Sequence, residues 1–103
     1  MATHFNQLTP AQAELLALLL EELGEAQQAI GKILRHGYES ENPFIEDGPT
    51  NRESLERELG DVSAAIRLLA KAGDIDDNAI VRAEVSKLNR VAAFLHHQPP
   101  RGN

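Results

Sequence analysis

The sequence contains no cysteine and no tryptophan, and its aromatic residues are only three Phe and one Tyr. Without cysteine, neither a disulfide nor a thiolate metal site can form. With so few aromatic residues, the core has to be built from aliphatic side chains. At 103 residues the chain has the length of one small domain, which keeps much of its surface exposed and gains stability by association.

Long hydrophobic runs and an excess of positive charge are also missing. No apolar run is long enough to span a bilayer, and the N-terminus lacks the basic-then-apolar layout of a signal peptide. The net charge of −6 disfavours non-specific binding to nucleic acid. We therefore expect a cytoplasmic protein that binds neither membrane nor nucleic acid. An acidic protein can still bind a polyphosphate when divalent cations reverse the local charge.

The apolar periodicity predicts three helices and no strand, so the expected fold class is all-α. The helices are expected over residues 10–36, 51–72 and 77–96. Thr9-Pro10 is a typical helix start, and Thr50 or Asn51 can cap the second helix. Gly37 and Gly73 are natural C-terminal stops.

The remaining segments are loops and ends. Residues 38–50 form a loop longer than a helix–helix connection requires, which hints at a function. We expect one helical domain over residues 1–97, with a short helical or irregular lead-in before residue 9, and a disordered tail at 98–103. About three main helices make too small a bundle for one chain, so we expect oligomerisation to complete it.

Two pairs of carboxylates are the most informative feature of the chain: Glu22 with Glu25, and Glu58 with Asp61. Residues three apart lie on one side of a helix, so two helices packed face to face would bring four carboxylates together. That much negative charge repels strongly unless a cation lies among it. Oxygen-only ligands select a hard cation, so we expect Mg²⁺, with Mn²⁺ as an alternative.

The angular positions around the first helix sharpen this expectation. With about 100° per residue, Glu22 lies at the centre of an apolar stripe and Glu25 about 60° from it. Glu21 points to the polar side. An ionised Glu in an apolar stripe is rarely buried unless it is paired or bound to metal. Arg57 and Arg67 are expected to project away from the Glu58/Asp61 side and so to leave those acids unpaired.

A second apolar side adjoins that stripe on the helix at 10–36. Together the two sides cover about 200° of arc, more than one small antiparallel partner can bury. The sequence therefore predicts a subunit interface on this second side, which carries Leu16, Leu20, Leu23, Ile30 and Leu34.

Gly24 and Gly60 each precede the second acid of a pair, inside a predicted helix. A glycine there costs about 1 kcal/mol relative to alanine. This cost can be offset if the missing side chain lets another helix or a ligand approach closely. The alternative is that the fold simply tolerates the cost.

The residues Glu21-Glu22-x-x-Glu25 and Glu58-x-x-Asp61, with Leu59-Gly60-Asp61-Val62, resemble the MazG-like all-α nucleoside triphosphate pyrophosphohydrolases. The resemblance covers roughly residues 10–95 and extends to Lys87-Leu88-Asn89-Arg90, which is similar to the family's downstream basic element. It implies a homo-oligomer, a dimer or tetramer, that binds Mg²⁺ through the four acids. The 32 residues between Glu25 and Glu58 somewhat exceed the family's usual spacing, so the chain looks like a small phage or prophage member with an enlarged loop.

The implied activity is cleavage of a (d)NTP into (d)NMP and pyrophosphate. Under this hypothesis Lys87, with Asn89 or Arg90, neutralises charge on the pyrophosphate side. The alternatives are a non-catalytic helical dimer that acts as an interaction or regulatory module with a vestigial metal site, and a bare metal-binding bundle.

The other candidate substrate-binding residues can also be explained by a structural role. Lys32 and Arg35 either bind phosphate or complement the helix dipole at the end of their helix. Three aromatic residues can stack on a base or pack locally, and two histidines are expected to be exposed at the end of the third helix. These residues are Phe5, Tyr38, Phe44, His96 and His97.

Overall fold

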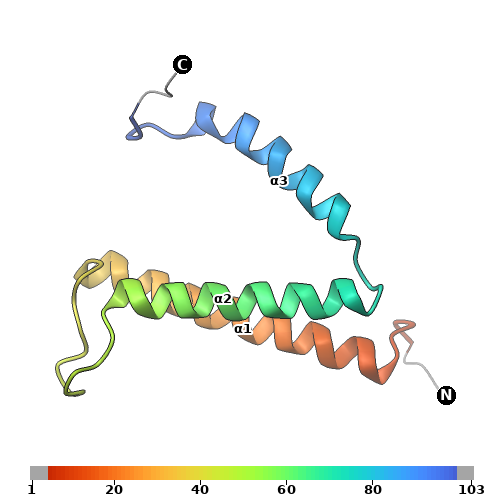
Figure 1. Ribbon diagram of the computed structural model, residues 1–103, viewed down its shortest axis with the longest axis horizontal. Coiled ribbons are helices and arrows are strands. Elements are labelled where there is room, and N and C mark those ends of the chain that lie inside the picture. Colours follow the sequence, from red (N-terminus) through yellow and green to blue (C-terminus); the bar gives the residue numbers. More distant parts are fainter. Residues whose placement is uncertain (1–4, 100–103) are drawn as a thin grey trace.

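The computed structural model describes residues 5–99 of the chain. Its helices are α1 (Pro10–His36), α2 (Asn51–Lys71), α3 (Asp77–Val91) and the short 3₁₀ helix η1 (Ala92–Phe94). Within residues 5–99 the only strand-like pairing is an isolated bridge between Glu41 and Thr50. Figure 1 shows α1 and α2 side by side as an antiparallel hairpin, while α3 leads away from it. The prediction of an all-α fold is confirmed.

Threonine caps fix the starts of α1 and α2. The backbone N–H of Gln12 donates to Thr9 Oγ1 at 3.1 Å, and the N–H of Thr9 donates to Gln12 Oε1 at 2.9 Å. Thr50 and Glu53 form the same reciprocal pair at the start of α2. The hydrogen bonds from Thr50 hold the pKa of the Glu53 carboxyl below its ordinary value. These capping boxes place both helix starts where the sequence predicts them.

Glycines in the left-handed region end both hairpin helices. Gly37 has φ 90°, and its N–H donates to the carbonyl of Ile33 at 2.7 Å. Gly73 has φ 80°, and the N–H groups of Gly73 and Asp74 donate to the carbonyls of Ala70 and Leu69. This second pattern is a Schellman motif, which favours glycine because other residues are strained there.

The prediction that the third helix continues to His96 is wrong. The α-helix ends at Val91, and Ala92–Phe94 form a tighter 3₁₀ turn. Leu95, whose N–H donates to the carbonyl of Ala92 at 3.3 Å, then takes an extended conformation. A 3₁₀ turn is a common end for an α-helix. His96 and His97 are exposed beyond it.

The single chain has a very small core. Its buried hydrophobic residues within the described range are Ala26, Ala29, Ala65 and Leu69. The accessible surface is 8555 Å², whereas a compact monomer of 11.3 kDa exposes about 5,700 Å². The radius of gyration is 17.8 Å, against about 13 Å for a compact domain of this length. The chain by itself therefore leaves much apolar surface uncovered.

The uncovered surface includes the second apolar side of α1 that the sequence identifies. Leu20 is 73% exposed and Leu34 is 82% exposed, and Leu16, Leu23 and Ile30 are also exposed. On α3, Val81, Val85 and Leu88 are exposed, and the helix contributes no buried residue. In agreement with Figure 1, α3 does not cover the hairpin of its own chain.

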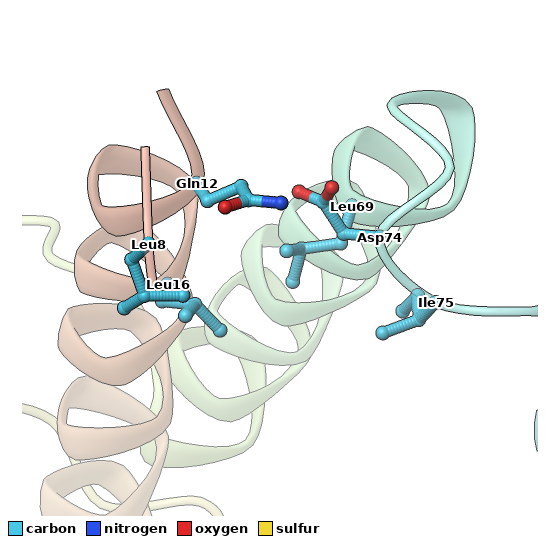
Figure 2. Close-up of a pocket in the computed structure, with 6 residues that line it drawn as sticks. All are labelled: Leu8, Gln12, Leu16, Leu69, Asp74 and Ile75. Atoms are coloured by element: carbon cyan, nitrogen blue, oxygen red, sulfur yellow. The ribbon is translucent and has the colours of Figure 1, made fainter. Parts of the chain in front are cut away.

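An apolar hollow of about 160 Å³ lies where α1 begins and α2 ends. Figure 2 shows Gln12 and Asp74 pointing toward one another above it. None of the four carboxylates lines it, so it is separate from the candidate site. Its lining consists of Leu8, Gln12, Leu16, Leu69, Asp74 and Ile75.

Two predictions concern membranes and chain ends. Across residues 5–99, no helix combines the length and apolar character needed to cross a membrane. The predicted tail at 98–103 lies mostly outside the described residues, as does the beginning of the predicted lead-in.

Candidate metal centre

The structure brings together the four carboxylates that the sequence singles out. Glu22 and Glu25 come from α1, and Glu58 and Asp61 come from α2. One oxygen of each side chain lies within 4.8 Å of one oxygen of every other. Three of these residues are half-buried, and Asp61 is exposed. The site is therefore open to solvent on one side.

Small side chains near the carboxylates let the two helices approach. Ala26 and Ala29 each lie one turn after an acid of α1, and Ala65 lies one turn after Asp61 on α2. All three alanines are buried between the helices. Because alanine ends at Cβ, the helix axes can come close enough for the neighbouring carboxylates to meet.

The crowding and partial burial raise the pKa values of the acids Glu22 and Glu25 on α1. Removal from water raises the pKa of Glu22, and the negative charge of Asp61 raises it further. For Glu25, a hydrogen bond shared with Glu58 is the largest cause of a raised pKa, followed by the charge of Glu22. The cluster is therefore electrostatically unfavourable with every carboxylate ionised.

Two carboxylate oxygens of the cluster lack a hydrogen-bond donor. Glu22 Oε2 and Glu58 Oε2 are buried, and no described residue donates to either. An unsatisfied buried carboxylate oxygen costs free energy, and a hard cation can satisfy it. An all-oxygen donor set with oxygens at mutual distances below 4.8 Å fits Mg²⁺ or Mn²⁺.

Arg57 lies closer to the site than its angular position predicts. Its Nη2 atom is 3.9 Å from Glu58 Oε1, so the expectation that Arg57 projects away from Glu58 is wrong. The long side chain reaches back from a neighbouring position on the helix. Because the Arg57 side chain is 66% exposed, this contact contributes little to stability.

A polar groove of about 290 Å³ continues from the carboxylates toward the end of the hairpin where α2 begins. Its lining residues on α1 lie at i, i+3, i+4 and i+7 from Glu25, and those on α2 lie at i, i+3, i+6 and i+7 from Asn51. Helical spacing could have revealed most of them in the sequence. Four of these residues, Gln28, Asn51, Ser54 and Arg57, are not among the site residues predicted from the sequence. The full lining is Glu25, Gln28, Ala29, Lys32, Asn51, Ser54, Arg57 and Glu58.

The basic candidates are distributed differently from the acids. Lys32 lines the groove, whereas Arg35 is exposed near the end of α1 and does not line it. Lys87, Asn89 and Arg90 are exposed on α3, which the chain does not pack against the carboxylates. A single chain thus does not bring these three residues to the acids.

The aromatic candidates do not line the groove. The guanidinium of Arg52 lies 4.4 Å from the ring centre of Tyr38, so Tyr38 packs locally. Phe44 is 93% exposed in the loop, and Phe5 is exposed before α1.

The base of loop 38–50 is held firmly against the start of α2. The N–H groups of Asn51 and Arg52 donate to the carbonyls of Ser40 and Tyr38 at 2.9 and 2.8 Å. The guanidinium of Arg52 also contacts the Glu39 carboxylate at 2.7 Å. Figure 1 shows the loop projecting beyond the hairpin. Beyond this base, residues 42–47 are exposed, and the N–H groups of Phe44 and Ile45 donate to the side-chain and backbone oxygens of Asn42 in a local turn.

Gly24 and Gly60 face open space within the chain. A Cβ atom added at either position would meet nothing within 4 Å apart from its own helix backbone and chain neighbours. Close approach of another helix of the same chain therefore does not explain them. A ligand or a second copy remains the alternative to simple tolerance.

Comparison with known proteins agrees with the geometry. The model of one family, the MazG nucleotide pyrophosphohydrolase domain, matches residues 11–93, which include both carboxylate pairs and all of α1 beyond its first residue, α2 and α3. No curated protein and no solved structure gives a significant match. Since the match spans most of the chain, this protein belongs to the MazG nucleotide pyrophosphohydrolase domain family.

Proposed function

We propose that this protein is a Mg²⁺-dependent nucleotide pyrophosphohydrolase that cleaves a (d)NTP into (d)NMP and pyrophosphate in the cytoplasm. The observation that carries the proposal is the cluster of four carboxylates with two buried oxygens that lack a donor. Family membership supports the same activity.

In this proposal the residues of the cluster bind the cation, and a carboxylate accepts the proton of the attacking water. Glu22, Glu25, Glu58 and Asp61 are the cation ligands. When bound, Mg²⁺ (or Mn²⁺) polarises phosphoryl oxygens and lowers the pKa of a water molecule. The proton of the attacking water goes to a carboxylate that is not fully engaged, or to the exposed Glu21 beside the cluster.

We also propose that a second copy of the chain completes the site. The exposed surface exceeds that of a compact monomer by about 2,800 Å² per chain, or about 5,600 Å² for two chains, which is at the upper end of the total area that obligate homodimers bury. The α3 helix is apart from its own hairpin and exposes an apolar stripe. Packing of α3 on a partner's hairpin would cover both apolar surfaces. It would also bring Lys87, with Asn89 or Arg90, toward the pyrophosphate side of the substrate.

A panel of canonical and modified nucleotides tests the activity. We expect the protein to release monophosphate and pyrophosphate from at least one triphosphate in the presence of Mg²⁺, because the carboxylates need a cation to bind a polyphosphate. Chromatography of the nucleotide product together with a pyrophosphate assay is the measurement. Addition of EDTA should stop the reaction. Release of orthophosphate instead of pyrophosphate would contradict the proposed bond of cleavage. No turnover with intact Mg²⁺ binding would contradict the activity and favour a non-catalytic helical module.

Loop 38–50 is proposed to cover bound nucleotide. Its base adjoins Asn51, which lines the groove, while Phe44 at its tip is 93% exposed. We expect hydrogen exchange in residues 42–49 to slow when Mg²⁺ and a non-hydrolysable nucleotide are added, since closure excludes water from the site. The amides of Asn51 and Arg52 should change less, because they already donate to the carbonyls of Ser40 and Tyr38 at the base of the loop. Unchanged exchange at the tip, with normal turnover of Phe44→Ala, would mean that the loop is only a connector.

A further inference from the structure

The groove beside the carboxylates is lined by a positively charged side chain from each of the two helices. Lys32 enters from α1 and Arg57 from α2, and both side chains are exposed enough to reach a ligand. Arg57 Nη2 lies 3.9 Å from Glu58 Oε1, so the groove begins at the edge of the carboxylate cluster. Lys32 lies seven residues after Glu25, which is about 10 Å along α1. A ligand bound at the carboxylates can therefore extend into the groove toward these cations.

The backbone at this end of the hairpin is already occupied. The first N–H groups of α2 donate to the carbonyls of Ser40 and Tyr38 and to Thr50 Oγ1. The start of α2 therefore does not offer the free N–H groups that usually bind an anion at a helix N-terminus. An anion in this groove has to be bound by side chains.

A third positively charged side chain near this end of the hairpin, Arg52, already has partners outside the groove. Its guanidinium binds the carboxylate of Glu39 and lies over the ring of Tyr38. The cationic side chains that line the groove are Lys32 and Arg57. The Ser54 hydroxyl and the Gln28 amide add neutral donors to the same lining. The groove offers hydrogen-bond donors, whereas the carboxylate cluster beside it is acidic. A polyphosphate fits this arrangement if its inner phosphates bind the cluster through a metal ion and its terminal phosphate binds the side chains of the groove directly.

We propose that Lys32 and Arg57 bind the terminal phosphate of a nucleoside triphosphate, while the inner phosphates lie at the carboxylate cluster. This proposal rests on the proposed function and adds a specificity to it. The protein discriminates triphosphates from diphosphates, because a diphosphate that occupies the cluster has no third phosphate to place in the groove. Arg57 is the stronger determinant, since its planar guanidinium can donate two hydrogen bonds to one phosphate.

Binding measurements on the full-length protein test the proposal without turnover. In the presence of Mg²⁺, isothermal titration calorimetry compares a non-hydrolysable triphosphate, the matching diphosphate analogue and inorganic tripolyphosphate. For Arg57→Gln we expect the Kd of the triphosphate to rise roughly tenfold and that of the diphosphate less than about twofold. Lys32→Gln should act in the same direction, and Arg57→Lys should restore part of the loss. Tripolyphosphate should follow the triphosphate, because the groove contacts no part of the nucleoside.

Arg67→Gln is the matched control. Arg67 is exposed on the same helix and does not line the groove, so its removal changes net charge by the same amount. It should leave the affinity for all three ligands unchanged. Helical circular dichroism and direct Mg²⁺ titration of each variant show whether the fold and the cluster are intact.

The outcomes separate this proposal from the proposed function. If the wild-type protein hydrolyses a nucleotide but Arg57→Gln and Lys32→Gln bind the triphosphate as tightly as wild type, the assignment of the groove is overturned and the activity stands. The same holds if both variants weaken the diphosphate and the triphosphate equally. If Arg57 and Lys32 determine polyphosphate affinity but no nucleotide is hydrolysed, the groove assignment stands and the activity fails.

Discussion

Replacement of Glu58 by Gln is expected to reduce nucleotide hydrolysis at least roughly a hundredfold while the protein stays folded, because the change removes a ligand of the metal. Glu22→Gln, Glu25→Gln and Asp61→Asn should have effects of the same size, since all four carboxylates meet within 4.8 Å. Steady-state kinetics with saturating Mg²⁺ measures the loss.

Thermal unfolding in EDTA supplies a second readout for these variants. Without a cation, the neutralised variants should be at least as stable as wild type, because each removes a negative charge from a crowded cluster. Glu56→Gln is the matched control on α2, since Glu56 is exposed and lies outside the cluster. Glu21→Gln should be milder than the four, because Glu21 is exposed beside the cluster. Wild-type rates in all four variants would show that the site is elsewhere.

A lysine in place of Leu20 is expected to dissociate the oligomer or unfold the chain. Leu20 is 73% exposed in the single chain and lies on the second apolar side of α1. If a partner covers it, the substitution loses about 2 kcal/mol of apolar burial and adds the cost of an unpaired buried charge. Analytical ultracentrifugation at micromolar concentration is the measurement. The wild-type protein should sediment as a dimer or tetramer of the 11.3 kDa chain.

Glu14→Gln is the control for that substitution. Glu14 is exposed on the polar side of α1, and its position in the sequence puts it about 120° around the helix from Leu20. The change raises the net charge by the same single unit as Leu20→Lys and should keep the wild-type mass. A wild-type protein with a monomeric mass near 11.3 kDa would refute the oligomer, and an unaffected Leu20→Lys would move the interface to another surface.

The parts of the fold that depend on neighbouring residues were predictable from the sequence. Thr9 and Thr50 begin helices because their side chains cap the adjacent backbone. Gly37 and Gly73 end helices because they accept positive φ. The convergence of the acids was also predictable, because the apolar stripe that holds Glu22 must turn toward α2.

The parts that depend on long side chains or on missing contacts were not predictable. Angular position describes where the Cβ of Arg57 points, whereas the guanidinium lies several bonds away and reaches back to Glu58. The direction of α3 depends on a short turn that includes Asp76 with φ −105° and ψ 116°. Under the proposed packing of α3 on a second copy, the apolar pattern of one chain does not determine that direction.

All four carboxylates lie on one hairpin of a single chain, between residues 22 and 61, whereas Lys87 lies on α3, which does not pack along this hairpin. Cation affinity is then a property of each chain and should not change on dilution. Turnover that needs α3 from a partner should fall with the square of protein concentration once the oligomer dissociates. A diluted sample would bind metal normally and hydrolyse almost nothing. Rates measured at a single low enzyme concentration would then understate the activity of the assembled protein.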